Sequence, residues 1–133
     1  MDPTALVTSA VSGGGELLKA LDDEKVQVTT AGWFYDSLEG VWRLLLAMPS
    51  VESQGRAVGY EAVQRVLAKI AKREPAPAVP ALNQIVVTSN KDPLVQTIRK
   101  AIRTGEKDVS AIRFTRNVIE NMFIADALIY RSS

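Results

Sequence analysis

The chain has 133 residues, of which 47% are hydrophobic and 23% are charged, and its formal net charge is +1. This composition is that of one globular domain and excludes a wholly disordered or fibrous chain. The sequence contains no cysteine and no histidine, which excludes disulfides, thiolate zinc sites and histidine-based acid–base catalysis. We therefore expect a protein that is not an enzyme and that holds no metal and no cofactor.

The first 30 residues are expected to form an N-terminal arm ahead of a helical domain over residues 31–133. A short helix from residue 4 to residue 11 precedes a glycine triplet at 13–15. We interpret the triplet as a hinge, because glycine adopts many backbone conformations. It is not a phosphate loop, since the Gly-Lys-Ser/Thr ending of such a loop is absent.

The sequence shows no targeting or membrane signal. Its first residues lack the basic segment of a secretory signal peptide. No apolar run reaches the roughly 20 residues that span a bilayer. An intracellular, cytoplasmic protein without membrane contact is therefore expected.

The spacing of apolar residues predicts four principal helices, near residues 33–48, 55–73, 93–104 and 109–131. Pro49 ends the first of them, because proline cannot continue a helix. Asp92 followed by Pro93 is typical of a helix start, and Gly105 is typical of a helix end. The last two helices are expected to pack as an αα-hairpin.

The predicted fold class is mainly α: an antiparallel four-helix bundle with a small two-stranded β element. Alternating valines predict a strand at Lys25–Thr30, whose expected partner is Gln84–Thr88. The tryptophans of the first predicted helix, Trp33 and Trp42, are interpreted as core, and a ligand platform is the alternative. The prolines between residues 74 and 80 predict a stiff, extended connector.

The stretch from Asp108 to Arg131 is the longest helical pattern in the chain, and Asp126 is the charged residue in its apolar arc. We interpret Asp126 as a structural buried carboxylate. Its expected partners are an arginine from a neighbouring helix, such as Arg65, or backbone or tryptophan N–H groups. The alternative is an acid with a perturbed pKa in a cleft.

Basic residues concentrate in the last third of the chain. Residues 99–116 contain six basic and two acidic side chains, a net charge of +4. Solvated helix faces are one interpretation. The other is a phosphate-binding face across the αα-hairpin, because arginine binds phosphate bidentately. The candidates for nucleic-acid binding are Arg99, Lys100, Arg103, Arg113 and Arg116.

Short sequence matches link the chain to a known family. Asp92-Pro93-Leu94-Val95 at the start of the third predicted helix, with Ala111-Ile112-Arg113 and Asn117 in the fourth, resembles coat proteins of rod-shaped plant RNA viruses of the tobacco mosaic type. The resemblance covers roughly residues 30–130. It implies a four-helix bundle that stacks into a helical rod, with RNA held between subunits near Arg113. The family's long inner loop is here reduced to about residues 105–108.

Together these observations predict a non-catalytic, self-assembling structural protein, coat-protein-like, whose basic helical face takes the RNA backbone. The expected partners are copies of the chain or a partner protein, with single-stranded RNA as a further candidate. The resemblance implies a virion as the location. The alternative function is a non-enzymatic protein–protein interaction (adaptor) module, and an enzyme that uses carboxylates ranks below it.

Overall fold

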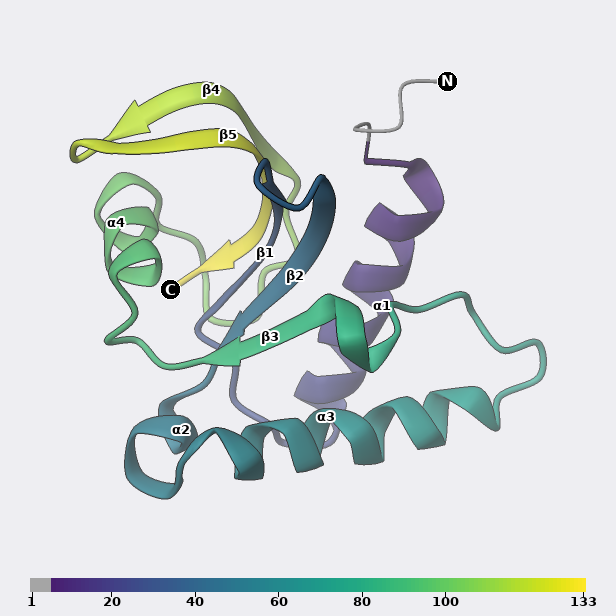
Figure 1. Ribbon diagram of the computed structural model, residues 1–133. Helices are drawn as coiled ribbons and strands as arrows, with labels where there is room; N and C mark the ends of the chain where they lie inside the picture. The colour runs from purple at the N-terminus through teal and green to yellow at the C-terminus, as the bar shows by residue number, and fades with distance from the viewer. Residues whose placement is uncertain (1–5) are drawn as a thin grey trace.

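The protein, described from residue 6 to residue 133 by a computed structural model, has a mixed α/β fold (Figure 1). Five strands form one sheet in the order β3-β2-β1-β5-β4. β2 and β3 run parallel, and the other neighbours run antiparallel. The elements are α1 (Thr8–Asp23), β1 (Thr30–Asp36), β2 (Val41–Ala47), α2 (Pro49–Gln54), α3 (Arg56–Ala71), η1 (Leu82–Gln84), β3 (Ile85–Thr88), α4 (Pro93–Ala101), β4 (Ile112–Ile119) and β5 (Met122–Ser132).

This architecture contradicts the predicted four-helix bundle, since a five-stranded sheet replaces two of the four helices. Helices cover both faces of the sheet: α1 and α3 pack on one face and α4 packs on the other (Figure 1). Alternate side chains of a strand point to opposite faces. On β5, Leu128 therefore joins the core beneath α1 and α3, whereas Ala127 and Ile129 pack with Ile98 of α4.

The predicted helix over residues 33–48 is the hairpin of β1 and β2. Its strands pair in a register that sets Trp33 opposite Leu44. Asp36 ends β1, and its side chain accepts hydrogen bonds from the next turn's backbone N–H groups. The helix prediction is wrong because both faces of these strands are covered, which gives them a nearly continuous apolar sequence instead of strict alternation.

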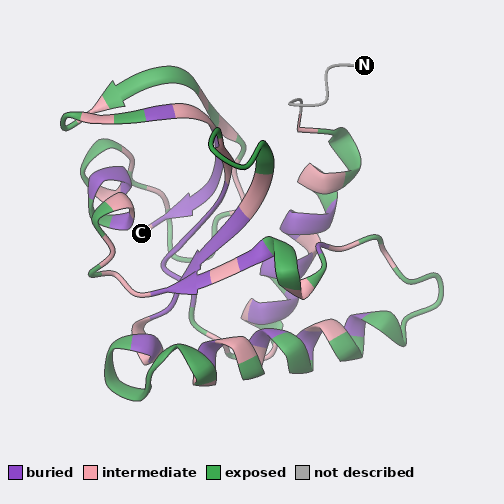
Figure 2. Cartoon of the chain, viewed as in Figure 1, coloured by how far each residue is buried: buried purple, intermediate pink, exposed green. Residues whose placement is uncertain are grey.

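The predicted helix over residues 109–131 is a second hairpin, formed by β4 and β5. Glu120 and Asn121 form its two-residue turn, with φ of 51° and 65°. Positive φ at both central residues is the geometry that matches the twist of the flanking strands. β4 is also rich in β-branched and aromatic side chains, which favour strands. Figure 2 shows β4 exposed along most of its length.

Several predicted elements are confirmed. α3 occupies the second predicted helix, and α4 begins at Pro93 with Asp92 as its cap, accepting a hydrogen bond from Leu94 N at 2.9 Å. β3 lies in the predicted strand, but it pairs with β2 and not with the segment at 25–30. The proline-rich connector between α3 and η1 contains no helix, as predicted.

The glycine triplet at 13–15 is not a hinge, because α1 runs through it without a break. A Cβ atom on Gly14 would lie 2.8 Å from Trp33 Nε1 and closer still to the hydroxyl of Tyr130. That hydroxyl accepts a hydrogen bond from Trp33 Nε1 at 2.9 Å and donates one to Val11 O at 2.6 Å. The triplet therefore lets α1 approach the sheet closely. The first two residues of the predicted short helix lie outside the described residues.

A bulge in β5 changes the direction of its last side chains. Ala31 pairs with Arg131 whereas Gly32 pairs with Ile129, so Tyr130 is an extra residue in β5. Successive side chains of a regular strand alternate, but a bulge breaks this alternation. As a result, Tyr130 and Arg131 both reach α1, the first through Val11 and the second through Asp22.

Candidate functional site

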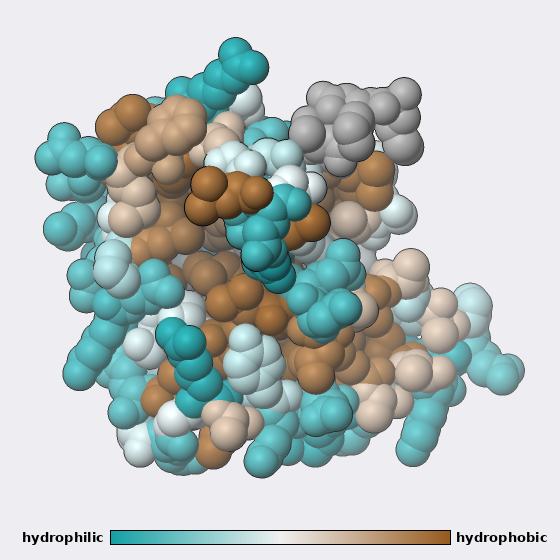
Figure 3. Space-filling model, viewed as in Figure 1, coloured by the Kyte–Doolittle hydropathy of each residue, from teal (hydrophilic) through white to brown (hydrophobic). Residues whose placement is uncertain are grey.

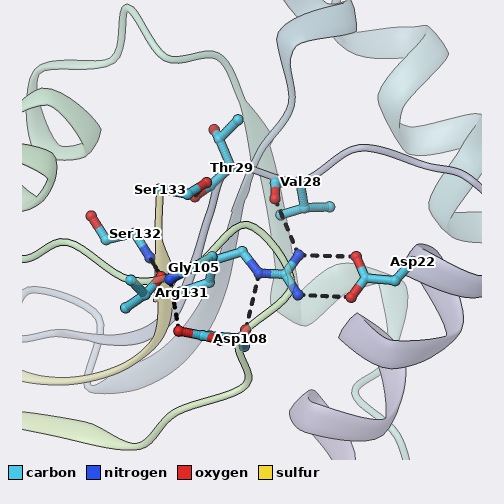
Figure 4. Close-up of polar contacts among 9 residues, drawn as sticks. Asp22, Val28, Thr29, Gly105, Asp108, Arg131, Ser132 and Ser133 are labelled. Carbon is cyan, nitrogen blue, oxygen red and sulfur yellow. Dashed lines mark hydrogen bonds and ion pairs between the residues drawn. The ribbon is translucent and has the colours of Figure 1, made fainter.

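A buried ion pair closes one end of the sheet, which we name the closed end: the end where Thr30 of β1 pairs with Ser132 of β5. Arg131 is fully buried there. Its guanidinium donates to both carboxylate oxygens of Asp22 at 2.9 and 2.7 Å, and also to the backbone oxygens of Val28 and Asp108 (Figure 4). The N–H donors of a guanidinium have fixed directions in one plane. These hydrogen bonds therefore hold α1, β5 and the loop before β4 in one arrangement.

A pocket of about 660 Å³ lies beside this ion pair, between the segment that leads into β1 and the chain that leaves α4. Its lining includes the uncharged polar side chains of Gln27, Thr29 and Thr104. Among the described residues, no aromatic side chain lines it. We name it the basic pocket, after its charged lining residues, which are Lys25, Arg99, Arg103, Lys107, Asp22 and Glu106.

Within the described residues, no acidic side chain forms an ion pair with the cations of the basic pocket. Asp22 is already paired with Arg131, so Glu106 is the remaining acidic side chain among the lining residues, beside four cationic ones. Arg99 donates from Nε to the backbone oxygen of Ser133 at 2.9 Å, which orients its guanidinium. The other three cationic side chains form no ion pair or hydrogen bond with any residue from 6 to 133. The pocket can therefore attract and hold an anion.

Lys25 enters the pocket from an unusual backbone conformation, with φ of 63°. Its N–H donates to Asp22 O, and the N–H of Val26 donates to Leu21 O. This pair of hydrogen bonds is the Schellman ending of a helix, in which the left-handed residue is usually glycine. A lysine at this position is strained relative to glycine. The requirements of the turn therefore do not explain why a lysine occupies it.

The predicted nucleic-acid candidates do not share one face. Arg99 of α4 and Arg103, just beyond its end, line the basic pocket, while Lys100 of α4 does not. Arg113 and Arg116 lie on β4, in the hairpin that replaces the predicted fourth helix. The basic helical face is therefore not formed, since its second helix does not exist.

Asp126 is half-buried and pairs with an arginine, but the partner is Arg113 of the neighbouring strand and not Arg65. Both contacts of the pair are 2.6 Å long, and Arg113 also lies 5.5 Å from the ring centre of Trp42. The hydrogen bonds that Arg113 donates to Asp126 raise the pKa of its guanidinium. This arrangement explains Asp126 as a structural residue on the sheet surface.

Two further groups have shifted pKa values for structural reasons. Burial raises the pKa of Tyr130 to about 12, against the opposing effects of its hydrogen bonds with Trp33 and the backbone. The hydrogen bond from Lys69 lowers the pKa of Glu24, which links α1 to α3 at the surface. Within residues 6–133, no three acidic side chains come together as a metal site, and no helix is long and apolar enough to cross a membrane.

The tip of the β4–β5 hairpin exposes apolar side chains. Val118 pairs with Phe123 across the strands, and the two are 63% and 64% exposed. The next pair toward the turn, Ile119 and Met122, is half-buried. Hydrophobic side chains gather at the surface over this hairpin, at the upper left of Figure 3. The hairpin tip, defined as Val118 and Phe123, is therefore a candidate contact surface.

Sequence reasoning missed Asp22, Lys25, Lys107 and Arg131. One signal was available for Arg131: it is a lone charge at the end of the apolar run from residue 127 to residue 130. A charge so placed is either at the surface or paired with a buried partner. The sequence contains no local signal for the partner, because Asp22 lies 109 positions away.

Comparison of the chain with protein-family models, with curated proteins and with solved structures found no match.

Proposed function

We propose that the protein is a non-catalytic module that self-associates through the hairpin tip. The observation that carries the proposal is the exposed cross-strand pair of Val118 and Phe123. Apolar area removed from water stabilises a contact by about 25 cal/mol per Å². Burial of these aromatic and branched side chains against another surface would therefore stabilise the contact.

A second copy of the chain is the partner that fits. The net charge of +1 provides little long-range repulsion between copies. Identical patches can face each other across a two-fold axis, so that each hairpin tip covers the other. Phe123 would then pack against Val118 or Phe123 of the second copy.

The free edge of β4 does not favour a continuous sheet between copies. Arg116 adopts a left-handed conformation with φ of 48°, which interrupts the regular row of backbone donors and acceptors along the strand. Charged side chains and irregular backbone on edge strands are common protections against strand pairing. The proposed contact is therefore made by side chains at the tip.

The proposal does not include a coat-like contact with RNA. That contact requires Arg99, Arg103, Arg113 and Arg116 on one helical surface, whereas the first pair lines a pocket and the second pair lies on β4. Arg113 is also engaged with Asp126. Self-association is retained because it depends on the hairpin alone.

Sedimentation velocity between about 10 µM and 1 mM protein tests the proposal. Two side chains per copy bury much less than the roughly 1,200 Å² of a stable interface, so we expect a weak, reversible dimer with a dissociation constant on the order of 100 µM. Phe123→Ser should leave a monomer throughout this range.

Leu38→Ser is the matched control, because Leu38 is 97% exposed in the other hairpin turn. It removes a similar apolar side chain and should leave association unchanged. A native protein that stays monomeric at about 1 mM would overturn the proposal. Equal weakening by Phe123→Ser and Leu38→Ser would also overturn it, since the contact would then be unspecific.

A further inference from the structure

We infer that the basic pocket binds a small molecule carrying two neighbouring phosphate groups. The site is distinct from the hairpin tip and does not depend on self-association. Its cations come from two separate parts of the chain: Lys25 follows α1, while Arg99, Arg103 and Lys107 belong to α4 and the loop beyond it. Their convergence is a property of the fold and not of a local run of basic residues.

The charge of the pocket matches this ligand. The four cationic side chains and that of Glu106 carry a summed charge of +3, once Asp22 is assigned to its ion pair with Arg131. A phosphate group carries about −1.5 to −2 at neutral pH, so two groups carry about −3 to −4. One phosphate, or one carboxylate, would leave part of the positive charge uncompensated.

The donors suit phosphate in geometry as well as charge. Arginine presents a planar fork that matches two phosphate oxygens, and lysine contributes a point charge that can turn toward either group. The Nε atom of Arg99 is already used by Ser133 O, so its outer nitrogens are the ones available to a ligand. Thr29 and Thr104 add hydroxyl groups to the lining.

The shape of the site favours a small molecule over RNA. Small-molecule sites have volumes of about 300–1,000 Å³, and this pocket measures about 660 Å³. Single-stranded nucleic acid is usually held by aromatic side chains on which bases stack, and none lines the pocket among the described residues. The cations surround one concavity and do not form a stripe.

The walls of the pocket are fixed before any ligand arrives. Thr104 N donates to Ser132 O, and Ser132 N donates to the hydroxyl of Thr104, so the segment after α4 is attached to β5. Behind it, the pair of Arg131 and Asp22 holds the end of α1 (Figure 4). Rigid walls reduce the entropy lost on binding, which raises affinity.

The backbone at Lys25 supplies an independent test of the site. Glycine is the preferred residue at φ of 63°, so Lys25→Gly relieves strain while it removes one cation from the pocket. If Lys25 had only a structural role, Lys25→Gly would change neither ligand binding nor, except by an increase, the melting temperature. In a binding site, the same change should weaken ligand binding while the melting temperature stays equal or rises.

Isothermal titration calorimetry with inorganic pyrophosphate, at about 50 mM salt, tests the inference. We expect saturable binding with one site per chain, and weaker binding of orthophosphate. Arg103→Gln combined with Lys107→Gln should weaken pyrophosphate binding at least tenfold. Lys100→Gln combined with Arg116→Gln is the matched control: it removes two positive charges outside the pocket lining and should change the affinity less than twofold.

Three results would overturn the inference. The first is no heat of binding and no change in melting temperature with pyrophosphate at millimolar concentration. The second is equal weakening by the pocket pair and the control pair, which would show a general effect of net charge. The third is tighter binding of a short single-stranded RNA than of pyrophosphate, with the RNA affinity reduced equally in the pocket double variant and the control double variant. That result would indicate diffuse contacts with the RNA backbone.

Discussion

β5 contributes to two bidentate arginine–aspartate pairs, one at the closed end and one midway along the β4–β5 hairpin, and the two pairs have different roles. At the closed end, the side chains of Arg131 and Asp22 are 0% and 16% exposed. On the β4–β5 hairpin, those of Arg113 and Asp126 are 43% and 22% exposed. Both pairs place a charged residue on β5, so the difference arises from what covers the strand.

Burial changes how much an arginine–aspartate pair contributes to the free energy of unfolding. Water screens an exposed pair, which usually contributes 1 kcal/mol or less to stability. A buried pair has lost its hydration, so removal of one partner leaves a charge with no compensation. The closed end is consequently the part of the molecule that tolerates least change, and the hairpin is free to serve as a contact surface.

Asp22→Ala should be the most damaging change, since it leaves the guanidinium of Arg131 buried without its carboxylate. We expect the free energy of unfolding to fall by about 3–5 kcal/mol. Urea denaturation monitored by tryptophan fluorescence measures it. Asp22→Asn should be milder, because the amide oxygen still accepts a hydrogen bond. A loss below about 1 kcal/mol for Asp22→Ala would show that water reaches the pair.

The closed end could not be predicted from the sequence. Its contacts join Asp22 to Arg131 over 109 positions, and the bulge at Tyr130 that directs Arg131 to α1 is set by tertiary packing. Elements with strong local signals were predicted correctly: Asp92 and Pro93 mark the start of α4, and apolar spacing marks α3. Local signals determine such boundaries, whereas long-range pairs require the fold.

The strands were missed for a physical reason. β1 and β2 are buried on both faces, so Trp33 and Phe34 are neighbours in sequence that pack in different cores. A run of this kind fits a helical spacing as well as a strand. Of the candidate site, the sequence indicated Arg99 and Arg103, which both fall in the predicted helix over residues 93–104 although α4 ends at Ala101. Lys25 and Lys107 could not be assigned to it, because only the fold brings them together.

Gly14→Ala separates the close packing of α1 on the sheet from helix propensity. Alanine favours a helix over glycine by about 1 kcal/mol. A Cβ atom at Gly14, however, would lie 2.8 Å from Trp33 Nε1, so α1 must move and the hydrogen bonds of Tyr130 weaken. We expect a net loss of roughly 1–3 kcal/mol.

Gly15→Ala is the control for this change. Its nearest neighbour would be a methyl group of Val109 at 3.5 Å, an ordinary contact. Thermal denaturation should show an equal or higher melting temperature for Gly15→Ala and a lower one for Gly14→Ala. Two variants of equal stability would mean that α1 does not depend on close approach to the sheet.

Asp126→Ala tests the exposed pair of the comparison. Arg113 keeps access to water and its contact with Trp42, so we expect a loss of about 0.5–1 kcal/mol. Chemical denaturation at low and high salt measures the effect, which should shrink as salt screens the pair. A loss as large as that of Asp22→Ala would contradict the contrast between the buried and the exposed pair.

The smallest expected effect concerns the turn of the hairpin. Glu120 and Asn121 have φ of 51° and 65°, and this type of turn is most favourable with asparagine followed by glycine. Glu120→Asn combined with Asn121→Gly should therefore raise the free energy of unfolding by roughly 0.5 kcal/mol. In a helix over residues 109–131, the glycine would instead lower it by roughly 0.3 kcal/mol, because glycine is less favourable in a helix than asparagine. The sign of the measured change thus distinguishes the hairpin from a helix. The melting temperature of the double variant gives this sign. Asn121→Ala is the comparison, because alanine favours a helix but is strained at positive φ. In the hairpin, Asn121→Ala should therefore lower the melting temperature.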